Sequence, residues 1–367
     1  MTLRVSIVTT GLGPGGVERV LANLIPELLA NDFQVTLITL DQGLTDWYTV
    51  PSQCVRVRLA ESKPSHSFAG GFVQNLQHLV ELRRAIRTAN PDVLLSCMPR
   101  TNIRARLASL CLGIPWVATE HAIGHDTPLI WRAFQRILYP YARKVTSSSQ
   151  GVSDQFAWLN QKKLVKIFSL VKVNKNEGAS LFVKDAAIPR IVFLGRLVEE
   201  KNPQLMLSAF HQLAKTNTKA ELWFIGSGEL EPELKSRALQ LGLGPRVQFP
   251  GGLTQPFATL AQAHVLALSS NFEGFGNVLA EAMLLGIPVV STDSLGPREI
   301  ISDGDTGLLV PVQNAEALSN GINSLIADPA FANKLALAGQ LSATQRFSEK
   351  VIVDQWLTVL NDAAANR

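Results

Sequence analysis

Short apolar runs alternate with longer amphipathic segments along the first half of the chain. The runs have strand length, and the segments between them repeat apolar residues on one helix face, as Val17, Leu21 and Leu24 do. Such alternation predicts βαβ units, in which a parallel sheet carries helices on both faces. We expect strands at 3–9, 34–40, 93–96 and 116–119, and helices at 15–29, 72–87 and 101–112.

The same pattern restarts after a polar, irregular stretch. The expected strands are 190–194, 220–225, 247–249, 265–268 and 288–292, alternating with helices at 203–215, 230–241, 255–263 and 277–285. The repetition predicts two doubly wound α/β domains, residues 1–172 and 188–347, joined by a linker at 173–187. A last helix within 348–367 would pack back on the first domain. Two such domains facing each other would enclose a cleft at the carboxyl ends of their strands, where these sheets bind ligands.

Composition narrows the protein class. The 367 residues are 46% hydrophobic and 17% charged, as in folded globular proteins and unlike disordered chains. The most apolar stretches, at 93–97, 191–194 and 265–269, are far shorter than the ~20 residues of a membrane-spanning helix. No signal peptide precedes the first expected strand, and three cysteines are too few for a disulfide framework or zinc site. We therefore expect a cytoplasmic protein.

The charge is unevenly divided. Residues 1–170 contain 18 Lys and Arg against 11 Asp and Glu, whereas residues 171–367 contain 16 against 19. The basic half suggests an anionic partner such as a phosphorylated substrate, nucleic acid or an acidic membrane surface, although ordinary surface charge would give the same balance.

A glycine-rich loop follows the first expected strand. Its Gly11–Gly16 segment has the GxGxxG spacing of a dinucleotide site, which would make the chain an NAD-dependent oxidoreductase. Against this, Pro14 offers no amide to a pyrophosphate, and Asp41 lies too far along the chain for the ribose-binding acid. Without a dinucleotide, the segment is still a loop that a ligand can approach closely, at a helix N-terminus that favours anions.

The second half carries two charged motifs that suit a phosphorylated ligand. Arg196 and Lys201 flank a turn, from which they would neutralise a diphosphate with charge-assisted bonds of ~1.5–3 kcal/mol each. In a second motif, Glu273 and Glu281 flank Gly-Phe-Gly at the expected start of a helix. One acid in the loop and one on the helix suit two hydroxyl-bearing parts of one ligand, such as two sugars. A solvated turn and a helix start with two solvated acids are the alternatives.

Together these residues resemble the family-4 glycosyltransferases, the retaining group with the GT-B architecture of two facing Rossmann-like domains. The resemblance covers nearly the whole chain. It rests on Gly15-Gly16-Val17-Glu18, Gly195-Arg196 with Lys201, Gly226-Ser227-Gly228, the pair Glu273 and Glu281, and Gly296-Pro297-Arg298-Glu299-Ile300.

The resemblance implies a role for each matching residue. Arg196 and Lys201 would clamp the diphosphate of a nucleotide-sugar, Glu273 would hold the donor sugar, and Glu281 would hold the ribose. His121, after a first-domain strand, matches the histidine that faces the donor sugar. The residues implied to bind the donor are Gly15, Gly16, Phe249 near the base, Phe275, Gly276, Asn277, Val278 and Glu281.

The resemblance also bears on the chemistry. The donor would be a UDP-sugar by family habit, carrying a hexose or N-acetylhexosamine, and no metal or other cofactor would be required. No protein nucleophile is assigned, so the leaving diphosphate would act as the base. Asp303-Gly304-Asp305 is interpreted as a turn rather than a metal site. Gly276 stands where the family often has proline, which predicts a more mobile loop. A sugar-nucleotide-binding protein without catalytic activity is the remaining alternative.

The acceptor is the least determined part. Arginines and aromatic residues interleave around 129–139, which suits anionic lipid headgroups and a polyprenyl-pyrophosphate-linked glycan acceptor. An ordinary helix with its apolar side in the core explains the same pattern. Arg100, Thr101 and Asn102, just past a strand, are the candidate acceptor contacts. We expect peripheral attachment to the inner face of the membrane, and no nucleic-acid partner because no recognition motif is present.

Overall fold

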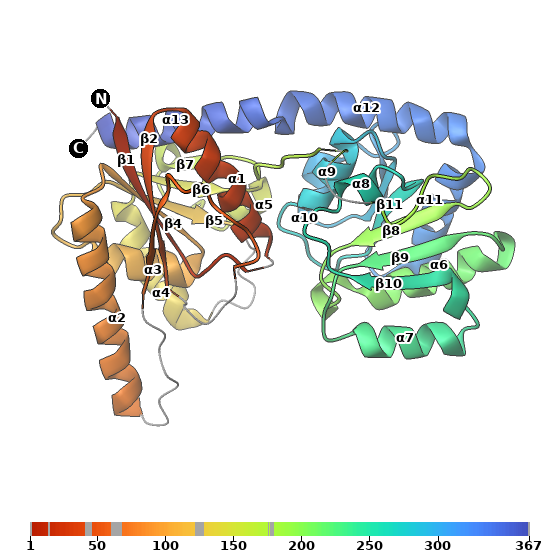
Figure 1. Cartoon of the computed structure of the whole chain (residues 1–367), viewed down its shortest axis with the longest axis horizontal. Helices are drawn as coiled ribbons and strands as arrows, with labels where there is room; N and C mark the ends of the chain where they lie inside the picture. The colour runs from red at the N-terminus through yellow and green to blue at the C-terminus, as the bar shows by residue number, and fades with distance from the viewer. Residues whose placement is uncertain are drawn as a thin grey trace. The chain divides into compact units, whose positions relative to one another are not determined.

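A computed structural model describes residues 2–13, 15–40, 46–59, 68–121, 128–174, 176 and 180–365, without the side chains of 68–73. The chain forms two compact units (Figure 1). The first combines residues 1–170 with 349–367, and the second is formed by residues 171–348. Asp41 lies outside the described residues.

The first unit is built on a seven-stranded parallel sheet in the order β3-β2-β1-β4-β5-β6-β7. The strands are β1 (Leu3–Thr9), β2 (Phe33–Thr39), β3 (Val55–Arg58), β4 (Val93–Cys97), β5 (Trp116–Glu120), β6 (Lys144–Ser147) and β7 (Leu164–Lys166). The helices are α1 (Gly16–Ala30), α2 (Phe68–Ala89), α3 (Pro99–Ala108), α4 (Leu129–Leu138), α5 (Gln150–Asp154) and α13 (Glu349–Ala365). Short 3₁₀ turns are η1 (Tyr139–Tyr141) and η2 (Gln161–Lys163).

The two faces of this sheet bury separate apolar clusters. On one face, α1 and the C-terminal helix α13 pack together, with Leu24, Ile25, Trp356 and Leu360 at most 3% exposed. On the other face, Ile86 of α2 and Tyr139 of η1 are fully buried. Residues from the end of the chain therefore complete a core that residues from its beginning started.

The second unit has a six-stranded parallel sheet in the order β10-β9-β8-β11-β12-β13. The strands are β8 (Arg190–Leu194), β9 (Glu221–Ile225), β10 (Val247–Gly251), β11 (Val265–Leu268), β12 (Val289–Thr292) and β13 (Leu308–Val310). The helices are α6 (Pro203–Thr216), α7 (Glu231–Gln240), α8 (Phe257–Leu260), α9 (Asn277–Leu284), α10 (Leu295–Ile300), α11 (Ala315–Ala327) and α12 (Pro329–Phe347). The turns η3 (Glu199–Lys201) and η4 (Gly244–Arg246) complete it.

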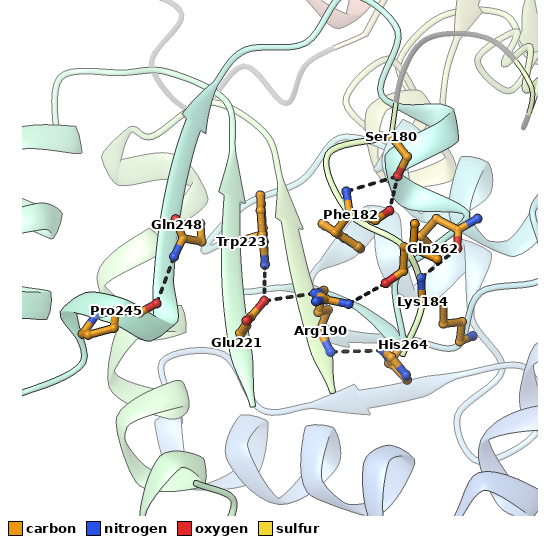
Figure 2. Close-up of polar contacts among 11 residues, drawn as sticks. Ser180, Phe182, Lys184, Arg190, Glu221, Trp223, Pro245, Gln248, Gln262 and His264 are labelled. Atoms are coloured by element: carbon orange, nitrogen blue, oxygen red, sulfur yellow. Dashed lines mark hydrogen bonds and ion pairs between the residues drawn. The ribbon is translucent and has the colours of Figure 1, made fainter. Parts of the chain in front are cut away.

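The segment that leads into β8 packs against the second sheet at the amino-terminal ends of its strands (Figure 2). Arg190 donates to Glu221 Oε2 at 3.0 Å and to the Val183 carbonyl at 2.6 Å, and its guanidinium lies over the Phe182 ring. The Arg190 backbone amide donates to Nδ1 of His264 at 3.1 Å. These contacts make the connecting segment part of the second unit.

Among the described residues, no helix combines the length and apolarity that a bilayer crossing requires.

Candidate functional site

Both sheets reverse their strand order once, and several of the expected site residues follow the strands at these reversals. In the second unit the order changes direction between β8 and β11, and in the first between β1 and β4. Loops that leave neighbouring strands at such a point diverge to opposite faces and open a crevice for a ligand. Arg196 and Lys201 follow β8, and Glu273 follows β11.

The charged residues of the second unit form one connected cluster. Lys201 Nζ is 2.6 Å from Glu273 Oε2, and these side chains are only 17% and 15% exposed. Glu200 bridges the two cations: its Oε1 is 3.5 Å from Lys201 Nζ and its Oε2 is 3.2 Å from Arg196 Nη2. The structure thus brings together the three residues that the motifs singled out. Glu200 was missed, although its i,i+4 spacing from Arg196 was visible in the sequence.

Backbone hydrogen bonds fix the turn that carries Lys201. Ser269 Oγ, just past β11, donates to the Lys201 carbonyl at 3.1 Å and to that of Asn202 at 2.8 Å. The Asn271 amide donates to the Glu200 carbonyl at 3.0 Å. Asn202 has a left-handed backbone (φ 44°), and its side chain caps α6. The turn after β8 is therefore tied to the loop after β11, which sets the distance between Lys201 and Glu273.

Gly226 and Gly228 pack against the backbone of the loop that carries Arg196. A Cβ on Gly226 would lie 1.9 Å from the Gly195 carbonyl oxygen, and one on Gly228 would lie 2.2 Å from that of Leu197. The Leu197 amide also donates to the Ser227 carbonyl at 2.9 Å. The Gly-Ser-Gly motif thus permits a backbone contact that no other residue type would allow.

The segment from Glu273 to Glu281 forms the start of α9. Phe275 is buried edge-on against Phe347, and Gly276 precedes the helix with φ 97°. Proline is locked near φ −65°, so this conformation excludes the proline that the family often has at this position and explains the glycine. Asn277 and Val278 open the helix, where free amides point outward. Glu281 is buried at 1% exposure.

Phe249 lies on β10, with its ring stacked on Phe224 at 5.2 Å and Lys235 Nζ 5.6 Å from the ring centre. One face of this aromatic is thereby used in packing. Its expected place near a nucleotide base stays a prediction.

The glycine loop of the first unit begins α1 at Gly15 and Gly16. The Gly15 amide donates to the Gly13 carbonyl at 2.8 Å. A Cβ on Gly15 would lie 2.0 Å from Glu18 Oε2, so a carboxylate already occupies the space beside this helix N-terminus. That carboxylate would repel the pyrophosphate of a dinucleotide.

His121 directly follows β5, and a buried polar network precedes it. Burial lowers the pKa of His121 to about 4, so the imidazole is neutral at pH 7. Burial raises the pKa of Glu120 to about 7. Tyr139 OH donates to Glu120 Oε1, as do Nδ2 of Asn102 at 3.0 Å and Nε2 of Gln135 at 3.4 Å. The motifs did not single out Glu120; its position next to His121 was the available signal.

Thr101 and Asn102, two of the three expected acceptor contacts, are buried, which corrects that expectation. Asn102 is fully buried, and its amide also accepts from Ser96 Oγ at 2.6 Å. Thr101 is 2% exposed. Asn102 belongs to the interior network, and Thr101 Oγ1 lies 3.4 Å from Thr10 Oγ1, because α3 turns that face toward the sheet. Only Arg100 is exposed, with its guanidinium carbon 5.6 Å from the Trp131 ring centre.

The Asp303-Gly304-Asp305 segment forms a turn. Asp303 Oδ1 accepts from the Leu309 amide at 2.9 Å, and Gly304 has φ 75°. Within the described ranges, no cluster of three or more His, Cys, Asp or Glu side chains could hold a metal ion.

The sequence matches known glycosyltransferase families over nearly its whole length. Residues 14–167 match the family model described as Glycosyltransferase Family 4, and residues 160–341 match that of Glycosyl transferases group 1. A Campylobacter jejuni α-1,4-N-acetyl-D-galactosaminyltransferase, named for a diNAcBac-PP-undecaprenol-linked substrate, is 27% identical over 98% of both chains. The lipopolysaccharide core glycosyltransferase LpsE of Rhizobium meliloti is 32% identical over 59% of this chain and 63% of its own.

Solved structures share the fold. Sucrose-phosphate synthase from Thermosynechococcus elongatus superposes with a TM-score of 0.84 over 100% of both chains at 20% identity. Anabaena HepE in complex with UDP-glucose gives 0.80 over 98% of this chain and 99% of its own, also at 20% identity. The predicted GT-B fold class is thereby confirmed, and the oxidoreductase interpretation of the first glycine loop is wrong. The chain is a glycosyltransferase and belongs to glycosyltransferase family 4.

Proposed function

We propose that this enzyme transfers a hexose or N-acetylhexosamine from UDP to a glycan carried on a polyprenyl diphosphate, with retention of anomeric configuration and without a metal. The observation that carries the proposal is the cluster of Arg196, Lys201 and Glu273 at the strand-order reversal of the second unit. It offers cations for a diphosphate beside a carboxylate for a sugar hydroxyl. The Campylobacter relative is named for a substrate linked to undecaprenyl diphosphate, which supports the acceptor class and a reaction at a membrane surface.

The proposed reaction breaks the bond between the anomeric carbon and the β-phosphate oxygen. The new bond to the acceptor oxygen forms on the same face of the sugar, and the acceptor proton passes to the departing phosphate oxygen, so that the products are UDP and the extended glycan. Arg196 and Lys201 would stabilise the charge that develops on the diphosphate. Glu273, held by Lys201, would fix a sugar hydroxyl and thereby the orientation of the donor.

The cluster also predicts a competition before the donor binds. Glu200 pairs with both Arg196 and Lys201 in the structure, at 3.2 and 3.5 Å. A diphosphate carries more charge than one carboxylate and would replace Glu200 as their partner. Glu200 would then turn outward, which its 47% exposed side chain permits.

A thermal-shift panel tests the donor class. UDP, GDP, ADP, UDP-sugars and NAD would each be added without metal; a ligand at 100 times its dissociation constant stabilises by ~2.7 kcal/mol. We expect UDP and one UDP-sugar to stabilise the second unit. Stabilisation by GDP or ADP alone would overturn the UDP assignment.

Transfer itself is tested with the stabilising UDP-sugar and a short polyprenyl-diphosphate glycan. We expect UDP release that depends on the acceptor, is unchanged by chelator, and yields a product with the donor's anomeric configuration by NMR coupling constants. Binding without acceptor-dependent release would mean a catalytically inactive protein. Loss of activity in chelator would remove the metal-free mechanism.

A further inference from the structure

Helix α4 is oriented with its apolar side away from the core. The residues that it turns inward are Gln135 and Leu138, both buried, together with the partly buried Trp131. Gln135 is held there by a polar contact, since its Nε2 donates to Glu120 Oε1 at 3.4 Å. A helix that covers a sheet ordinarily turns its apolar face to the core, whereas α4 leaves most of its apolar residues exposed.

The outward face of α4 is correspondingly apolar. Ile130 and Ile137 are each 62% exposed, and Leu129 is 81% exposed. Phe134 joins them on this face, and Tyr141 extends the row beyond the helix at 66% exposure. We call these five residues the α4 outer face. Contiguous exposed apolar residues of this kind mark a surface that contacts something other than water.

Cations are concentrated in the part of the chain that contains the α4 outer face. Between Asp92 and Asp154 the sequence has seven Lys and Arg and only two acids, Glu120 and Asp126. Glu120 is buried, and Asp126 lies outside the described residues. The cations are Arg100, Arg104, Arg106, Arg132, Arg136, Arg143 and Lys144, none of which is buried.

Three of these arginines lie against aromatic rings. The guanidinium carbon of Arg100 is 5.6 Å from the ring centre of Trp131, and that of Arg106 is 5.4 Å from the ring centre of Tyr141. The third pair is Arg136 and Trp158, at 5.6 Å. Aromatic rings and arginines favour the depth at which lipid headgroups meet acyl chains, because each has an apolar body and a polar part.

From these contacts we propose that the α4 outer face inserts into the headgroup region of an anionic lipid bilayer, with the nearby cations on the lipid phosphates. The apolar row supplies burial and the cations supply attraction to negative lipid. A second copy of the chain is the other possible occupant, but pairing this face with itself would bring like charges together. The inference deepens the proposed function, on which it rests for the lipid-linked acceptor.

Vesicle sedimentation tests the proposal on the full-length protein, with neither donor nor acceptor present. We expect binding to vesicles of phosphatidylglycerol and phosphatidylcholine, and loss of binding to phosphatidylcholine alone. In about 1 M salt, where the screening length falls to ~3 Å, binding should weaken strongly. The double variant Ile130→Ser/Ile137→Ser should reduce the partition coefficient roughly tenfold or more, because it removes two large side chains from the inserted face.

A matched control is available in the second unit. Leu337 and Leu341 on α12 are 59% and 62% exposed, so Leu337→Ser/Leu341→Ser removes the same kind of surface elsewhere and should bind vesicles like the parent. Equal thermal stability of both double variants and the parent would show that folding is intact.

Several results would overturn the proposal. Absence of vesicle binding at low salt would do so, as would equal binding by the two double variants. Concentration-dependent dimerisation in ultracentrifugation, abolished by Ile130→Ser/Ile137→Ser, would identify a second copy as the occupant instead. Transfer to a detergent-solubilised acceptor is measured separately. Normal transfer without vesicle binding would refute only the proposed insertion of the α4 outer face. Vesicle binding without transfer would refute only the proposed reaction.

Discussion

Lys201→Ala is the most informative perturbation of the charged cluster, because the residue contacts Glu273 and is held by a turn that other residues fix. The turn stays in place without the lysine side chain, since Ser269 binds the Lys201 backbone carbonyl and the Asn271 amide binds that of Glu200. The substitution therefore removes one ammonium group and leaves its surroundings in position.

The magnitude follows from the geometry. The 2.6 Å contact to Glu273 is a charge-assisted hydrogen bond between side chains that are 17% and 15% exposed. Such bonds contribute ~1.5–3 kcal/mol to stability, and Lys201→Ala should destabilise the fold by about that much. Removal of one preorganised donor to a developing negative charge typically lowers kcat by ~10²–10³, and we expect that loss in transfer.

A double-mutant cycle separates the two effects. Lys201→Ala, Glu273→Gln and the double variant would be compared by urea unfolding and by UDP release with saturating acceptor. If the lysine only pairs with the glutamate, the double variant should recover stability and activity together. We expect it to recover stability only, because the diphosphate still lacks its cation and the donor sugar lacks its carboxylate. Lys334→Ala, an exposed cation on α12, is the control for loss of one positive charge.

Near-normal turnover of Lys201→Ala, or recovery of turnover in the double variant, would refute the assignment of Lys201 to the leaving group. A loss confined to KM, with kcat unchanged, would indicate binding of the donor without stabilisation of the transition state.

Three further predictions concern other parts of the chain. Burial raises the pKa of Glu120 from its ordinary value of 4.5 to about 7, so its stabilising contribution is present at acidic pH and is lost as the pH rises through about 7. Glu120→Gln should therefore flatten the fall in the free energy of unfolding between these two pH values. Burial lowers the pKa of His264, whose Nδ1 accepts from the Arg190 amide, so its contribution is lost as pH falls below the ordinary value of 6.5; His264→Asn should reduce acid destabilisation in urea titrations at graded pH. Gly276→Ala should cost ~1–2 kcal/mol from its positive φ, plus crowding by Glu273 and Leu279 at 3.3 Å, whereas Gly242→Ala, at φ 69° with nothing within 4 Å, should show the backbone cost alone in the same unfolding assay.

The central strands were predictable because burial on both faces leaves a continuous apolar run. β1 and β4, for example, match the expected 3–9 and nearly match 93–96. The short edge strands β3 and β7 were missed because each carries charged residues and is exposed on part of its surface. β6 was missed because Lys144–Ser147 contains only one apolar residue, although its last three residues are buried.

The residues of the candidate site were also predictable only in part. The motifs singled out Arg196, Lys201 and Glu273. The structure brings them together because turns that follow neighbouring parallel strands lie at the same end of the sheet. The spacing of Glu200 from Arg196 was visible in the sequence, but its second contact, with Lys201, needed coordinates. Polar residues after a strand also looked alike, and only the structure distinguished the exposed Arg100 from the buried Asn102. Likewise, the sequence around α4 left open whether its apolar side faces the core or the surface, and only the structure shows the direction.

The packing of α13 has a consequence for the order in which the chain matures. The first unit consists of residues 1–170 with 349–367, so its apolar cluster against α1 stays uncovered while residues 171–348 are being synthesised. Domains generally fold as units as they leave the ribosome. The second unit can therefore finish before the first, and a nascent chain would expose Leu24 and Ile25 until Trp356 and Leu360 arrive. Removing the last helix would make that transient state permanent, so truncation at this end should yield chaperone-bound or aggregated protein.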